Sequence, residues 1–262
     1  MFRTIVNTLH PTLFYIFISI IYVGFAIVVY VIATKIVPSK RLKDDRFDEA
    51  VSMSLGLVNG VYSILLGFLL FLIWENYQTA EQVVVDEGSK LTIMWEGSRV
   101  FPASVAKGLQ EAIEQYAKEV AEEEWPAMAD GEQDADIPQL LSNLYTLIQS
   151  YSPETTVTQT FYSEILSALN AIMELRNHRL SLLKSAIPTA WYVFIFFVAF
   201  VLILLNALSL RRHSMQLYMH ILLTLVITFY LTAITALSYP FSGYISVDKS
   251  LFLQGSLQKI HH

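Results

Sequence analysis

The chain has 262 residues, of which 54% are apolar, and its formal net charge at pH 7 is −6. It contains no cysteine, which excludes disulfide bonds, thiolate metal sites and cysteine nucleophiles. Basic residues gather at the flanks of apolar stretches while the middle of the chain is acidic, so nucleic acid is not an expected partner.

Four stretches carry no Asp, Glu, Lys or Arg: residues 11–34, 50–74, 187–210 and 215–239. Each can cross a bilayer as a helix, because about 20 apolar residues span its roughly 30 Å hydrocarbon layer. The first is too long for the apolar region of a signal peptide and is expected to be a retained anchor. The sequence therefore predicts an all-α integral membrane protein with four spans, divided into residues 1–74, an extramembrane helical domain at 75–186, and residues 187–262.

Basic residues mark the two connections expected on one side of the membrane. They are Lys35, Lys40, Arg41, Lys43 and Arg46 after span one, and Arg211 and Arg212 after span three. Residues 75–186 hold 7 Lys and Arg against 18 Asp and Glu, a net charge of −11. Because basic loops are typically cytoplasmic, we expect the acidic domain and both termini outside the cytoplasm.

The acidic domain is expected to be helical throughout. No proline separates Pro38 from Pro102, so the helix of span two should continue past Trp74 to about Leu91. A second helix is expected from Ser104 to near Trp125, an acidic loop at 130–138, a short helix at 140–148 and a longer one at 155–184.

Several separated motifs resemble those of the bacterial bestrophin-like-domain family of four-span membrane proteins. They are WE at residues 74–75, WEGSRVFP at 95–102, EWPAM at 124–128, RNHRL at 176–180, IPTAW at 187–191 and YPFSG at 239–243. Tyr239 stands where the family usually has histidine, so a titratable role at that position is not expected. The resemblance implies a place in the bacterial inner membrane and kinship with anion channels. In true bestrophins, however, the domain between spans two and three is cytoplasmic, opposite to what the basic loops predict.

Span two has a face of small and polar residues that recurs every three or four positions. It consists of Ser52, Gly56, Asn59, Gly60, Ser63 and Gly67. Such a face is typical of close helix packing, and it also suits a pore-lining helix. In the second case Phe68, Phe71 and Trp74 are expected to form a hydrophobic constriction that closes by dewetting.

Three cations precede span three: Arg176, Arg179 and Lys184. They are interpreted either as interfacial residues paired with carboxylates such as Glu75 and Glu81, or as a ring of charge at a pore mouth. In span four, His220, Thr224, Thr228, Thr232 and Thr235 form a polar stripe expected to bond within the helix bundle.

The alternating acids that begin at Asp130 do not form an EF-hand, because Ala135 and Leu141 stand where glycine and glutamate are needed. A looser divalent site with Glu122, Glu123 and Glu124 is the alternative to a solvated loop. Phosphate loops, nucleophile elbows and zinc signatures are absent, so we expect neither an enzyme nor a bound cofactor.

Two functions remain open. The first is a homo-oligomeric channel for inorganic ions with span two lining the pore, and the second is a non-conducting membrane scaffold, sensor or accessory subunit. The small-residue face of span two slightly favours the channel.

Overall fold

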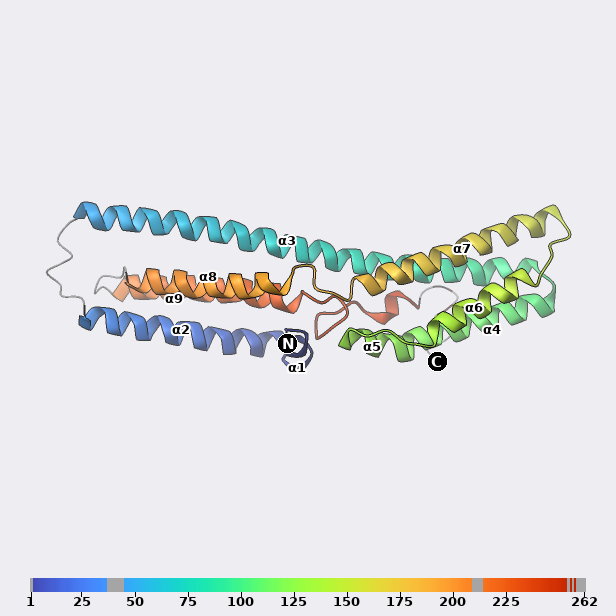
Figure 1. Cartoon of the computed structure of the whole chain (residues 1–262), viewed down its shortest axis with the longest axis horizontal. Coiled ribbons are helices and arrows are strands. Elements are labelled where there is room, and N and C mark those ends of the chain that lie inside the picture. Colours follow the sequence, from blue (N-terminus) through green and yellow to red (C-terminus); the bar gives the residue numbers. More distant parts are fainter. Residues whose placement is uncertain (1, 37–44, 209–213, 254, 256, 258–262) are drawn as a thin grey trace. The chain divides into compact units, whose positions relative to one another are not determined.

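The computed structural model describes residues 2–36, 45–208, 214–253, 255 and 257, and these residues form helices and loops without strands (Figure 1). The chain divides into two compact units. One combines Met1–Trp74 with Ser185–Ser238, and the other combines Glu75–Lys184 with Tyr239–His262. Helix α3 (Asp45–Gly97) is uninterrupted over 53 residues and contributes to both units, which confirms the predicted extension past Trp74. At about 1.5 Å per residue it is far longer than a bilayer is thick.

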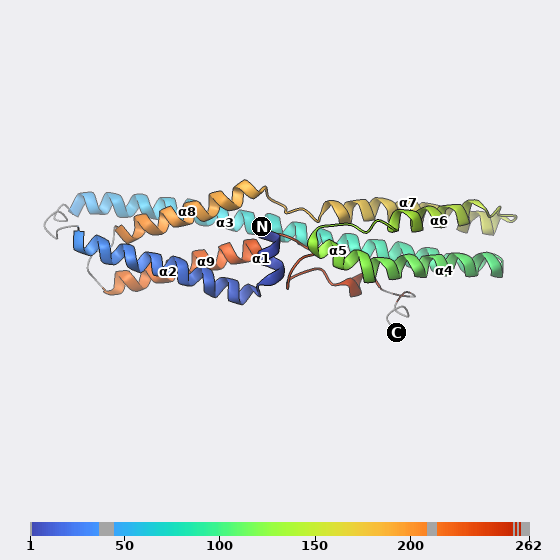
Figure 2. The ribbon, with the colours of Figure 1, turned by 60° about the horizontal axis from the view of Figure 1, so that its bottom comes forward.

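The first unit is a bundle of apolar helices. It contains α1 (Phe2–Thr8), α2 (Pro11–Ile36), the first part of α3, α8 (Thr189–Leu208) and α9 (Ser214–Ala236). Helices α2, α8 and α9 lie side by side (Figures 1 and 2). Four of these helices are long and apolar enough to cross a membrane, as the sequence predicts. The short α1 was not anticipated.

The second unit packs helices around a core of its own. It contains the second part of α3, α4 (Ala103–Glu119), α5 (Trp125–Asp130), α6 (Ile137–Gln149) and α7 (Thr156–Ser181), with the short turns η1 (Ser98–Val100), η2 (Val120–Glu124) and η3 (Lys249–Leu251). Local sequence sets the helix starts: Pro102 and Pro138 precede or open helices, and Thr155 forms a capping box with Thr158. The expected short helix begins three residues earlier than predicted, at Ile137.

The prediction that the second domain helix ends near Trp125 is wrong. After α4 the chain makes a π-helical turn, η2, and continues directly into α5, which ends at Asp130 and is capped by Gly131 with a left-handed φ of 86°. Proline cannot donate a backbone hydrogen bond and its ring clashes with the carbonyl four residues earlier in an α-helix. In the wider turn the N–H of Trp125 donates to Val120, five residues back, so Pro126 is accommodated and the helical path continues.

The segment after span four also differs from the division made from sequence. From Tyr239 onward the chain packs into the second unit, where Phe241, Val247, Phe252, Leu253 and Leu257 are buried in its core. The second unit, called the helical unit below, is thus built from two parts of the sequence. The segment after span four supplies core residues that the helices of this unit lack.

Candidate functional site

The small-residue face of α3 is open in the protomer. Ser52, Gly56, Gly60, Ser63 and Gly67 are exposed, and a β-carbon added to Gly56, Gly60 or Gly67 would meet no atom within 4 Å. These glycines are therefore not explained by packing within one chain. A helix in lipid gains little from such a bare face unless another backbone approaches it.

The expected constriction lies partly on this face. At about 100° per residue, Phe71 and Trp74 continue the line of Gly60 and Gly67, while Phe68 lies about 100° away from Gly67 around the helix. All three aromatic side chains are exposed, by 58% for Phe68, 60% for Phe71 and 46% for Trp74. The geometry therefore joins Phe71 and Trp74 to the small-residue face and separates Phe68 from it.

Two polar contacts fix the orientation of α3 against α8. The amides of Asn59 and Asn206 exchange hydrogen bonds, each 3.1 Å long, and the Tyr62 hydroxyl donates to the carbonyl of Ile195 at 2.6 Å. Asn59 thus serves packing within the protomer. It is a polar member of the small-residue face, so the contact also determines the direction in which Gly56 and Gly60 point.

The polar stripe of α9 is buried inside the first unit. Thr224, Thr228, Thr232 and Thr235 donate to carbonyls of their own helix, as expected for hydroxyls in lipid. Thr228 also contacts the Ser19 hydroxyl of α2 at 3.0 Å. The stripe therefore serves helix packing.

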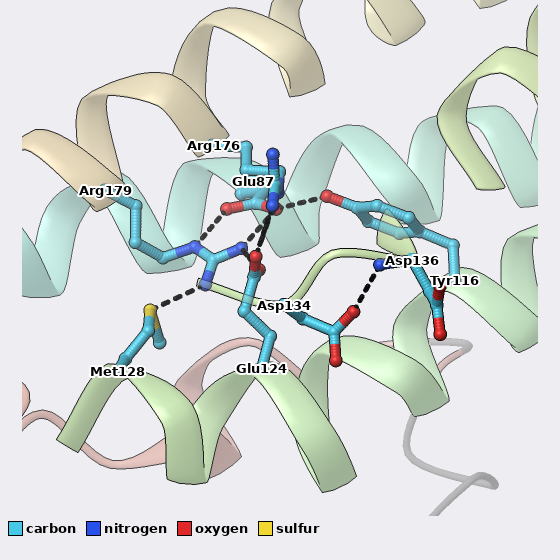
Figure 3. Close-up of polar contacts among 8 residues, drawn as sticks. All are labelled: Glu87, Tyr116, Glu124, Met128, Asp134, Asp136, Arg176 and Arg179. Carbon is cyan, nitrogen blue, oxygen red and sulfur yellow. Dashed lines mark hydrogen bonds and ion pairs between the residues drawn. The ribbon is translucent and has the colours of Figure 1, made fainter. Parts of the chain in front are cut away.

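A cluster of charged side chains with one tyrosine is buried in the second unit, and four separate elements contribute to it (Figure 3). This buried charge cluster consists of Glu87 from α3, Tyr116 from α4, Glu124 from η2, and Arg176 and Arg179 from α7. Two carboxylates face two guanidinium groups, so the cluster is neutral as a whole. Burial of charge is tolerated when each ion is paired and hydrogen-bonded.

Arg179 is the centre of the cluster. Its Nε donates to Glu87 Oε2 at 2.8 Å and its Nη2 donates to Glu124 Oε2 at 2.7 Å. Its Nη1 points to the sulfur of Met128 at 3.0 Å, and its carbon Cζ lies 5.8 Å from the ring centre of Trp125. Burial alone lowers the pKa of Arg179, but Glu87 and Glu124 outweigh this and raise it, so Arg179 is permanently charged.

The other members complete the pairing. Arg176 donates to Glu124 Oε1 through Nε at 3.1 Å and through Nη2 at 2.5 Å, and the Tyr116 hydroxyl donates to Glu87 Oε1 at 2.8 Å. Burial, and then the charge of Glu87, raise the pKa of Tyr116 well above its ordinary value. Tyr116 is therefore a neutral donor at physiological pH.

The π turn explains how Glu124 reaches this cluster. Of three consecutive acids, Glu122 and Glu123 are exposed whereas Glu124 is fully buried. A wider turn adds one residue to the helical path and shifts the faces that follow it. The turn therefore brings a carboxylate to the two arginines.

These contacts correct two expectations from the sequence. Arg176 and Arg179 are buried and bound to Glu87 and Glu124, not to Glu75 or Glu81, so the structure does not support a ring of exposed charge made from them. Of the three predicted cations only Lys184 is exposed. The looser divalent site also does not form, because Glu124 belongs to the buried charge cluster.

A different cluster of acidic side chains occurs on the surface. Carboxylates of Glu119, Asp134 and Asp136 lie within 4.8 Å of one another, and Asp134 accepts a 2.6 Å bond from the Asp136 backbone. Burial and then the neighbouring carboxylates raise the pKa of Glu119. Exposed acidic groups of this kind are common without a bound ion.

Sequence reasoning missed Glu87, although a signal was present. Ala80, Val84, Leu91 and Met94 form the apolar stripe of α3 in this unit, and Glu87 occupies the position between Val84 and Leu91 on the same face. A carboxylate on a core-facing stripe needs a buried cation, and Arg176 and Arg179 were the basic pair at helical spacing.

The Bestrophin-like domain family model matches residues 20–252 of the chain. The fold is similar to a crystal structure of a bacterial bestrophin homologue from Klebsiella pneumoniae carrying a single substitution, with a TM-score of 0.68, 12% identity, and coverage of 94% of this chain and 97% of that one. It is also similar to the crystal structure of a substituted membrane protein, with a TM-score of 0.67, 12% identity, and coverage of 94% and 95%. No curated protein matches.

Proposed function

The chain belongs to the bestrophin-like family, and on this basis we propose that it is a homo-oligomeric ion channel of the bacterial inner membrane in which α3 lines the pore. Bestrophins are ion channels, and the likeness to a bacterial bestrophin homologue extends over nearly the whole chain.

The observation that carries the proposal is the open face of α3. A β-carbon on any of its three glycines would meet no atom within 4 Å in the part of the chain that the structure describes, and two exposed aromatic residues, Phe71 and Trp74, continue the same face. In a ring of identical subunits this face surrounds an axis, with the small residues at a wide part and the aromatic rings at a narrow part. When water leaves the narrow part, ions cannot pass through it.

Charge in the helical unit favours cations over anions as the permeant species. Arg176 and Arg179 are neutralised by Glu87 and Glu124 and are withdrawn from solvent. What remains exposed in residues 75–186 is strongly acidic, because the segment has 18 acids against 7 bases. A strongly acidic surface outside the membrane attracts cations from solution and repels anions.

The test is ion flux from liposomes containing the purified protein, with the mass of the assembly measured in the same preparation. A closed oligomer and flux above that of empty vesicles are expected. A folded oligomer that conducts no ion would contradict the channel proposal.

The basic loops support a topology with the helical unit and both termini outside the cytoplasm. A cysteine placed at Gly131 should then react with a membrane-impermeant thiol reagent in intact cells, and one at Ser39, which lies outside the described residues, should not. The reverse labelling would give the chain the orientation of true bestrophins.

The second candidate is a non-conducting scaffold, sensor or accessory subunit. It is favoured by the size of the helical unit, whose core draws on α3, α4, α6, α7 and the C-terminal segment and whose charged surface suits a partner protein. Capture of a defined partner by a protein without flux would support it.

A further inference from the structure

The helical unit contains a pocket of about 230 Å³ that is unrelated to the face of α3 proposed to line the pore. The pocket lies where the start of α4 meets the end of α6 and the beginning of α7. Its wall includes Phe101, Val105, Gly108, Leu147, Tyr151 and Tyr162. A volume of this size equals that of about eight water molecules at roughly 30 Å³ each, which is room for a molecule of one or two rings.

Gly108 keeps this space open. It lies inside α4, where glycine costs about 1 kcal/mol relative to alanine, and a β-carbon on it would meet no atom within 4 Å. Gly97, elsewhere in the same unit, has a packing partner instead, because a β-carbon there would contact Ile165 at 3.4 Å. Among the described residues, none would contact a β-carbon at Gly108, and the effect of this glycine is to leave room in the pocket.

The lining defines the chemistry of a ligand. No charged side chain lines the pocket, and Phe101 and Tyr151 present aromatic rings whose centres are 4.7 Å apart. The hydroxyls of Ser104, Tyr151 and Tyr162 form no hydrogen bond with any part of the chain that the structure describes. An apolar body with a few free polar groups is the usual form of a small-molecule site.

We propose that this pocket binds a small, uncharged ring compound that carries one hydrogen-bonding group, of the size and polarity of indole. The ring packs against Phe101, Val105 and Leu147, and its polar group bonds a tyrosine hydroxyl. A carboxylate derivative of such a compound is rejected, because the pocket offers its charge no cation.

The experiment titrates the full chain in lipid nanodiscs with indole by calorimetry, and repeats the titration with indole-3-carboxylate. Saturable binding of indole is expected, with binding of the carboxylate at least about tenfold weaker. Absence of saturable indole binding, or equal binding of the carboxylate, would overturn the proposal.

Variants distinguish indole bound in the pocket from indole dissolved in the lipid. Gly108→Leu fills the pocket and should abolish saturable binding, while Ala103→Leu places the same side chain at an exposed position of α4 outside the pocket and should leave it unchanged. Leu147→Ser, at a side chain that is 39% exposed and therefore contributes little to the core, should weaken binding even if the glycine variant does not fold. Equal binding by Leu147→Ser and wild type, or loss in the Ala103 variant, would contradict the site.

The hydroxyl contact is tested by Tyr151→Phe and Tyr162→Phe. At least one should weaken indole binding and leave the binding of indene, which has no N–H group, unchanged. If both variants bind indole as the wild type does, the assignment of the polar group is wrong.

Discussion

The carbonyl oxygen of Phe252 lies so close to Gly88 that a β-carbon on this glycine would clash with it. Gly88 is on the buried side of α3, one residue after Glu87, and Phe252 is fully buried in the segment that follows span four. Backbone thus packs directly on backbone at this point. The contact holds the C-terminal segment over the buried charge cluster, where the Phe252 ring lies 5.9 Å from the Arg179 guanidinium.

Gly88→Ala should therefore destabilise the helical unit by about 1–3 kcal/mol, the usual cost of overpacking, although alanine is the better helix former. The clash is with backbone, which cannot rotate away as a side chain can. Thermal unfolding followed by far-ultraviolet circular dichroism measures the change.

The matched control is Gly108→Ala in α4. There the new methyl group meets nothing within 4 Å, so only the helix preference acts, and stability should rise by up to about 1 kcal/mol. A shift of the same sign in both variants would contradict the close approach of Phe252 to Gly88.

The contact also shows why much of the fold was predictable and the tail was not. Uncharged stretches of more than twenty residues identify spans directly, and the absence of proline between Pro38 and Pro102 predicted the continuous α3. The tail has no such periodic signal. Its place depends on a glycine 164 residues earlier in the chain and on rings that meet only in the folded unit, such as Trp125 with Phe241 at 5.9 Å.

Arg179→Met should destabilise the protein strongly, by about 3–5 kcal/mol, because it leaves Glu87 and Glu124 buried without their shared cation. Arg99→Met is the control: Arg99 pairs with Glu96 at 2.9 Å on the surface, and its loss should cost at most about 1 kcal/mol. Denaturant unfolding would compare them. Equal effects would show that burial of the cluster contributes nothing.

The raised pKa of Tyr116 predicts how the free energy of unfolding changes in alkaline solution. Because its pKa is raised in the folded chain, the folded state keeps a proton that the unfolded state loses above pH about 10. Its contribution is fully present below pH 10 and falls as pH rises, by up to about 1.4 kcal/mol per pH unit. Tyr116→Phe should lower stability at pH 8, through loss of the bond to Glu87, and flatten the decline above pH 10.

The control for this pH profile is Tyr244→Phe, at a side chain that is 62% exposed. It should leave the alkaline slope unchanged, because the substitution does not touch the buried charge cluster. Melting temperatures between pH 8 and 11 for the three proteins provide the comparison. If the Tyr116 variant lost stability with rising pH as steeply as the wild type does, Tyr116 would not be the group responsible for this loss.

Gly60→Leu tests assembly rather than folding of the protomer. Since a β-carbon at Gly60 meets no described atom within 4 Å, the larger side chain should leave the unfolding of isolated subunits unaltered and weaken or remodel the oligomer. Native mass spectrometry of the wild type and the variant gives the result. An unchanged mass and thermal stability would show that this face is not packed against another subunit.

The sequence predicted only those parts of the candidate site whose residues lie on a single helix. The face of α3 follows from spacing along one element, as Gly60, Gly67 and Trp74 show. The partners of Arg176 and Arg179 lie 52 to 92 residues away in sequence, and one of them, Glu124, depends on a π turn that no periodic pattern announces. Spacing placed the two arginines together but could not show that they point into a core.

The last prediction concerns the constriction. If α3 lines a pore, Phe71→Ala and Trp74→Ala should raise ion flux in liposomes, because smaller side chains lower the barrier to wetting. Phe68→Ala should have a smaller effect, since Phe68 lies about 100° from the line of Gly60, Gly67 and Trp74. The three residues are exposed to a similar degree in the protomer, so simple loss of apolar surface cannot produce the difference. Equal increases in all three variants would contradict the assignment of the pore face, and no flux from any of them in folded, oligomeric protein would leave the scaffold or sensor function as the better account.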